Sequence, residues 1–81
     1  MIRCPCCNCL TIDDYMHPIV EICEVCYWQY DEVAQEKPDE VIGPNHICLN
    51  EAILNYRKYG AIDKKYVDYV RKPYKYELPQ Y

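Results

Sequence analysis

A chain of 81 residues forms one domain whose core is too small for stability without a staple, and its seven cysteines predict that a metal or disulfides provide one. No apolar run is long enough to span a membrane and no apolar leader opens the chain, so we expect a cytoplasmic protein rather than a membrane or secreted one. The net charge of −4 is uneven: residues 1–51 carry ten acids against two bases (−8), and residues 52–81 carry seven bases against three acids (+4). The acidic part disfavours simple nucleic-acid binding, because phosphate contacts need clustered Lys and Arg.

Residues 1–30 form a cysteine zone, with two Cys-x-x-Cys pairs. Between the pairs, residues 10–12 and 19–22 are short, apolar and β-prone, and residues 13–18 have the composition of a turn. This pattern predicts a β-hairpin that links the two pairs.

The pairs can be written in two registers. The first uses four cysteines with zinc-site spacing: Cys4, Cys7, Cys23 and Cys26. The second replaces the first pair with Cys6 and Cys9. A zinc knuckle turns sharply after its second ligand, where a positive φ favours Gly or Asn; this residue is Asn8 in the first register and Leu10 in the second. Pro5 also favours a turn directly after Cys4. We therefore predict the first register, and the spacing leaves the second open.

Four thiolates bind zinc tetrahedrally and leave no coordination position for water, so we expect one structural zinc ion, with iron as the alternative metal. The two histidines, His17 and His46, are more typical of surface or capping positions than of ligands. Trp28 directly follows the second pair, and we expect its ring to be part of the core. Disulfide formation or thiol chemistry is the competing interpretation of the cysteines.

Two segments lack regular periodicity. Residues 31–47 are acidic and contain Pro38, Gly43 and Pro44, so a loop is predicted there. Residues 73–81 have three tyrosines and two prolines and are predicted to form an extended tail.

Residues 48–72 are predicted to form two helices. The first is the segment LNEAILNYRKYG, residues 49–60, in which apolar side chains recur with helical spacing from Leu49, and Gly60 suits the left-handed residue that ends a helix. The second helix has Asp63 as its N-cap and ends before Pro73.

The motifs CPCC, EICEVCYW, GPNHICLNEAILNYRKYGA and YVRKP, in this order, resemble the bacterial CPCC cysteine-rich small proteins. The resemblance extends from Cys4 to about Pro73. It implies a cytoplasmic zinc-ribbon-like protein, of a size that suits an immunity, phage or regulatory partner. The chain differs from the family pattern at four positions: Asn8 for Gly, Glu24 for Pro, Tyr27 for Phe and Cys48 for Ser.

The expected fold is a small α+β domain: a zinc-ribbon, rubredoxin-like β-hairpin with two zinc knuckles, followed by two C-terminal α-helices. Our first functional hypothesis is a non-enzymatic protein that binds a protein partner through an acidic, aromatic face: Tyr27, Tyr30, Asp31, Glu32, Asp39 and Glu40. The second is nucleic-acid binding through basic residues of the C-terminal half: Arg57, Lys58, Lys64, Lys65, Arg71, Lys72 and Lys75. The third is a thiol enzyme or redox sensor that uses Cys6 or Cys9.

Overall fold

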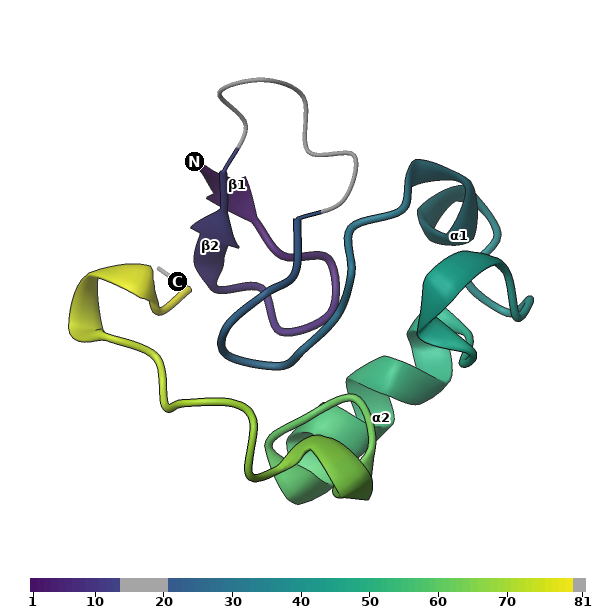
Figure 1. Cartoon of the computed structure of the whole chain (residues 1–81). Helices are drawn as coiled ribbons and strands as arrows, with labels where there is room; N and C mark the ends of the chain where they lie inside the picture. Colours follow the sequence, from purple (N-terminus) through teal and green to yellow (C-terminus); the bar gives the residue numbers. More distant parts are fainter. Residues whose placement is uncertain (14–20, 80–81) are drawn as a thin grey trace.

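The computed structural model describes residues 1–13 and 21–79 (Figure 1). Its two strands, β1 (Ile2–Arg3) and β2 (Leu10–Ile12), pair antiparallel, with Ile2 opposite Ile12 and Arg3 opposite Leu10. The strand expected at 10–12 is therefore present, and within the described residues its partner is β1, across the first Cys-x-x-Cys segment.

Half of the predicted second strand, residues 19 and 20, lies outside the described residues, as does all but the first residue of the turn predicted at 13–18. Of the described part, Ile22 forms an isolated antiparallel bridge with Gln29. This bridge brackets the second Cys-x-x-Cys segment as β1 and β2 bracket the first, so each pair of cysteines is held in its own hairpin-like loop.

The prediction of a continuous loop over 31–47 is wrong, because the segment contains the short helix α1 (Glu32–Glu36) and a 3₁₀ turn, η1 (Gly43–Asn45). Asp31 begins α1: its carboxylate accepts hydrogen bonds from the backbone N–H groups of the second and third helical residues. Buried Ala34 joins α1 to the core. The Pro and Gly residues that suggested a loop all follow α1.

Helix α2 (Leu49–Tyr59) agrees with the first predicted helix, which begins at Leu49 and is ended by Gly60. Leu49 and Ala52 are buried, and Gly60 ends the helix with a φ of 84° while its N–H donates to the carbonyl of Tyr56. Cys48 is the N-cap residue, and its thiol makes no capping hydrogen bond, as expected of a weak acceptor.

The prediction of a second helix between Asp63 and Pro73 is wrong, because this segment contains only the 3₁₀ turn η2 (Lys64–Tyr66). Asp63 caps this turn as expected. Further along, the N–H of Arg71 donates to the carbonyl of Glu24 at 3.1 Å, in the second cysteine loop. The segment thus forms backbone contacts with a distant part of the chain, and its β-branched residues, such as Val67, have little intrinsic preference for a helix.

The tail is also more ordered than predicted, since it contains the 3₁₀ turn η3 (Lys75–Glu77). The guanidinium of Arg3, on β1, donates to the carbonyls of Glu77 at 3.0 Å and Leu78 at 3.2 Å. The C-terminal segment therefore lies against the N-terminal hairpin (Figure 1).

The core is built around the cysteines, six of which are buried. Trp28 is fully buried, which confirms its predicted place in the core. Other buried side chains come from every part of the fold: Ile12, Val25, Ala34, Leu49, Ala52, Ala61 and Ile62. Within residues 1–13 and 21–79, no helix has the length and hydrophobicity that crossing a bilayer requires.

Candidate metal centre

The two cysteine loops share one backbone geometry. In the first, the N–H of Asn8 donates to the carbonyl of Cys4 at 2.8 Å, and in the second the N–H of Tyr27 donates to the carbonyl of Cys23 at 2.8 Å. The residue after the second cysteine has a positive φ in both loops: 63° at Asn8 and 76° at Tyr27. The predicted positive φ is confirmed at Asn8, and Tyr27 adopts the same conformation, which is rare for an aromatic residue.

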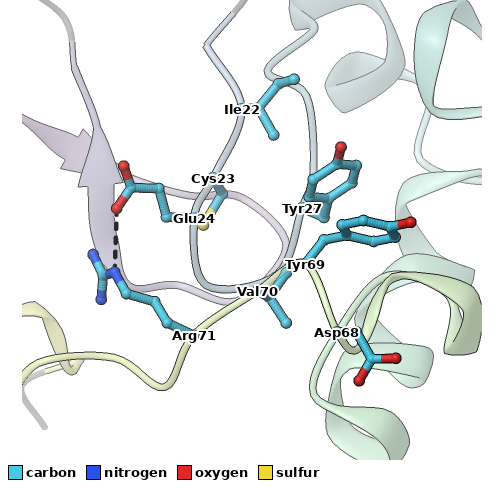
Figure 2. Close-up of a pocket in the computed structure, with 8 residues that line it drawn as sticks. All are labelled: Ile22, Cys23, Glu24, Tyr27, Asp68, Tyr69, Val70 and Arg71. Atoms are coloured by element: carbon cyan, nitrogen blue, oxygen red, sulfur yellow. Dashed lines mark hydrogen bonds and ion pairs between the residues drawn. The ribbon is translucent and has the colours of Figure 1, made fainter.

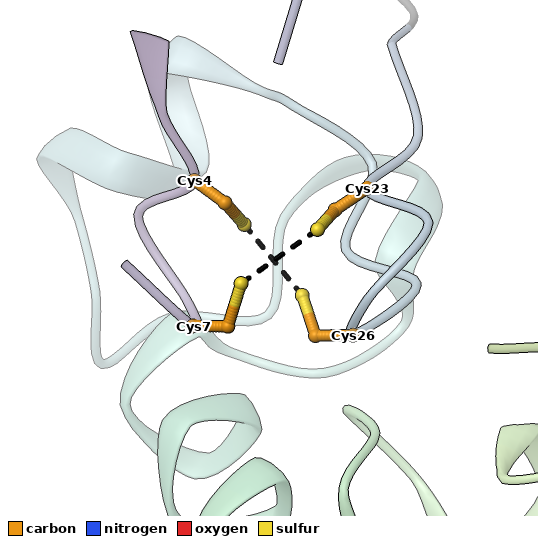
Figure 3. Close-up of side chains that lie close together, drawn as sticks. All are labelled: Cys4, Cys7, Cys23 and Cys26. Carbon is orange, nitrogen blue, oxygen red and sulfur yellow. Dashed lines mark hydrogen bonds between the residues drawn. The ribbon is translucent and has the colours of Figure 1, made fainter. Parts of the chain in front are cut away.

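These loops bring four sulfurs together: Cys4, Cys7, Cys23 and Cys26. Their Sγ atoms all lie within 4.8 Å of one another (Figure 3). The Sγ atoms of Cys4 and Cys26 are 3.6 Å apart, and those of Cys7 and Cys23 are 3.7 Å apart. A tetrahedron with Zn–S bonds of about 2.3 Å has S–S edges of about 3.8 Å, so the spacing fits one tetrahedral ion.

The other cysteines are not part of this group. Cys6 and Cys9 are buried, with 5% and 2% of their surface exposed, and the thiol of Cys9 lies 3.8 Å from the carbonyl of Cys7. Cys48 is half-buried at the start of α2. The structure thus assembles the cysteines of the first register and leaves Cys6 and Cys9 aside. All seven cysteines are free thiols.

Hydrogen bonds among the four sulfurs shift the pKa values of these thiols in different directions. A hydrogen bond with Cys23 is the main cause that raises the pKa of Cys4, Cys7 and Cys26. Conversely, hydrogen bonds first with Cys26 and then with Cys4 and Cys7 lower the pKa of Cys23. Cysteines bind a metal ion as thiolates, so a divalent ion that binds these four sulfurs releases their protons.

Cys23 has an additional partner outside the cysteine group. The hydroxyl oxygen of Thr11, on β2, lies 2.9 Å from the Sγ of Cys23, and Thr11 is itself buried. Groups that bond to metal-ligating atoms orient the ligands and tune the metal. Nothing in the spacing of the cysteines indicated Thr11, because the contact depends on how β2 lies against the second loop.

His46, the histidine that the structure describes, does not join the cluster. His46 is exposed at the end of η1, and His17 lies outside the described residues. Among the His, Cys, Asp and Glu residues that the structure describes, the four clustered cysteines are the group whose side chains are placed to hold a metal ion.

The six residues expected to contact a partner lie in two parts of the chain. Five of them flank or begin α1: Tyr30, Asp31, Glu32, Asp39 and Glu40. Three of these carboxylates already have partners. Asp31 caps α1, Asp39 accepts from the amide of Asn50 at 2.6 Å, and Glu40 forms an exposed ion pair with Lys37 at 4.0 Å. Tyr27 belongs to a different cluster, where its ring stacks on Tyr66.

The basic residues of the second hypothesis are spread over α2, η2 and the tail. Six of them are exposed: Arg57, Lys58, Lys64, Lys65, Lys72 and Lys75. Arg71 instead forms ion pairs with Glu24 at 3.1 Å and Glu77 at 2.8 Å. Sequence reasoning missed this network, because nothing in the composition of the tail marks Glu77 as a buried residue.

Comparison with known proteins gives one match. The model of a family described as "Cysteine-rich CPCC" matches residues 2–77. No curated protein and no solved structure matches the chain.

Proposed function

Since this chain belongs to the cysteine-rich CPCC family, we propose that it is a small zinc-binding, non-enzymatic protein that acts by binding another protein. The observation that supports zinc most directly is the group of four buried sulfurs within 4.8 Å of one another. Cys4 and Cys7 form one zinc knuckle, and Cys23 and Cys26 the other. In a reducing cytoplasm these cysteines stay reduced and available to a metal ion.

Zinc in this site is structural. Four thiolates complete its coordination, so no position remains for a water or a substrate. The ion connects two loops that are separated in sequence and lie at the centre of the core, so its binding energy is also folding energy.

The proposal disfavours thiol chemistry at Cys6 and Cys9. Both side chains are almost completely buried, and burial raises the pKa of the Cys9 thiol. Reactive cysteines are typically exposed and have a lowered pKa.

Native mass spectrometry with counted thiol alkylation tests the metal site. We expect one zinc ion per chain, with the four ligand cysteines protected until a chelator removes the metal and the fold is lost. Cys23→Ala should abolish zinc binding, and Cys48→Ala, at a half-buried position outside the group, should retain it. Retention of zinc by Cys23→Ala, or its loss in a Cys6→Ala, Cys9→Ala double variant, would contradict the assignment.

Cross-linking of the tagged, zinc-loaded protein in cells tests the interaction. The proposal is supported if a protein is cross-linked in an amount that rises with the amount of zinc-loaded bait, and if the Cys23→Ala variant no longer captures it. Capture of chaperones and ribosomes alone would count against it. Salt-dependent binding to single-stranded DNA or RNA would instead favour the exposed lysines as a nucleic-acid surface.

A further inference from the structure

A groove of about 440 Å³ lies between the second cysteine loop and the segment that follows η2 (Figure 2). From the loop it is lined by Ile22, Cys23, Glu24 and Tyr27. The residues on the opposite wall are consecutive, 68–71. The groove therefore lies directly beside the four-sulfur site, because Cys23 belongs to both.

One side of the groove is aromatic. The ring of Tyr27 stacks on Tyr66 with a centroid distance of 4.5 Å, and its centroid is 6.0 Å from that of Tyr69 at an interplanar angle of 36°. Tyr69 is 69% exposed, an unusual position for a ring that packs against two others. The cluster already attracts a cation of the chain itself, since the Nζ of Lys65 lies 5.1 Å from the centroid of Tyr66.

The charges of the groove are mainly negative. Asp68 and Glu24 are exposed, and the Glu24 side chain retains 71% of its accessible surface. Arg71 is the basic residue of the lining, and two carboxylates offset its charge: its Nη atoms donate to buried Glu77 at 2.8 Å, and its Nε donates to Glu24 at 3.1 Å (Figure 2). Asp68 is therefore the carboxylate of the lining that Arg71 does not engage. A zinc ion with four thiolates adds a net charge of about −2 close by.

From this combination we infer that the groove binds an arginine or lysine side chain of the protein partner, held between the face of Tyr69 and the carboxylate of Asp68. The inference rests on the proposed function, since it needs a protein partner and a zinc-loaded site. A cation over a tyrosine ring is attracted by the negative face of the ring, and nearby carboxylates add to that attraction. An acidic or phosphate-bearing ligand would meet the same carboxylates and be repelled.

The test is an NMR titration of the ¹⁵N-labelled, zinc-loaded full chain with blocked pentapeptides. The probe peptide has a central arginine between leucines, and two matched peptides carry citrulline or glutamate in its place. We expect shift changes concentrated in residues 22–27 and 68–71, and an affinity for the arginine peptide about tenfold above that for citrulline.

Variants locate the binding. Tyr69→Ala and Asp68→Asn should each weaken binding of the arginine peptide by about threefold or more, and Tyr69→Phe should restore the affinity that Tyr69→Ala loses. Tyr76→Ala is the matched control, because Tyr76 is 66% exposed but does not line the groove, and it should leave binding unchanged. Zinc content and spectral dispersion show whether each variant remains folded.

Several results would overturn the inference. The first is equal affinity for the arginine and citrulline peptides, and the second is tighter binding of the glutamate peptide. The third is chemical-shift changes that map outside the groove, or none up to about 10 mM peptide. A partner captured in cells equally well by the chain and by Tyr69→Ala would refute the groove but keep the proposed function. If no protein partner is captured, the proposed function fails, and the titration still decides whether the groove selects a cation.

Discussion

The guanidinium of Arg71 donates two parallel hydrogen bonds to the carboxylate of Glu77, from Nη1 to Oε1 and from Nη2 to Oε2, each 2.8 Å long. The Glu77 side chain is only 3% exposed, and it also accepts the N–H of Tyr74 at 2.7 Å. The Nε of Arg71 also donates to the carboxylate of Glu24 in the second cysteine loop, and the guanidinium of Arg3 donates to a backbone carbonyl of η3. Together, these contacts of Arg71 and Arg3 join the tail to the metal-site loop and to the hairpin.

Removing one member of this pair should destabilise the zinc-loaded protein. Arg71→Ala leaves the buried Glu77 carboxylate without its main partner, and we expect a loss of about 2 kcal/mol in the free energy of unfolding, measured with denaturant. Lys75→Ala, an exposed change in the same tail, is the control and should cost much less. Equal effects of the two changes would mean that the ion pair contributes nothing specific.

The same pair predicts a pH dependence. The hydrogen bonds from Arg71 hold the pKa of Glu77 below its usual value. A carboxyl with a lowered pKa stabilises the fold fully above its unfolded value of about 4.3, and the contribution is lost as the pH falls through the folded value. The difference in unfolding free energy between the parent protein and Glu77→Gln should therefore be constant near neutral pH and shrink in acid. The two proteins are compared because acid also releases zinc from both of them, and this common loss cancels in the difference. A difference in unfolding free energy that grows in acid would refute the assignment.

Thr11→Val should change the metal site without emptying it. Loss of the hydroxyl removes the 2.9 Å contact with the Cys23 sulfur, and we expect zinc affinity to fall by about tenfold. Cobalt substitution gives an independent readout, since the sulfur-to-cobalt charge-transfer band should shift when this sulfur loses its hydrogen bond. Thr11→Ser keeps the hydroxyl and is the control. An unchanged band in Thr11→Val would show that Thr11 only fills space.

The positive φ of the first loop can be tested at Asn8. Asn8→Leu should destabilise the zinc-loaded protein by about 1 kcal/mol, because a branched side chain is strained in the left-handed region, whereas Asn8→Gly should be neutral or stabilising. Asn8 is exposed, so lost packing does not complicate the comparison. If the Leu and Gly variants unfold at the same denaturant concentration, the loop does not need this conformation.

What the sequence alone determined depends on short-range chemistry. The spacing of the cysteines and the turn preference of Asn8 selected the four sulfurs that the structure brings together. Helical periodicity and Gly60 gave α2 with its correct end. These features are encoded within a few residues, so they can be read without knowing the rest of the fold.

Only the tertiary structure decided the features that depend on distant segments. β2 pairs with β1, and Arg71 contacts Glu24 across 47 residues in place of a second helix. The burial of Glu77 and the contact of Thr11 with Cys23 follow from the same packing. In a chain this small, short segments have weak intrinsic preferences, and the contacts made around the cysteine core outweigh them.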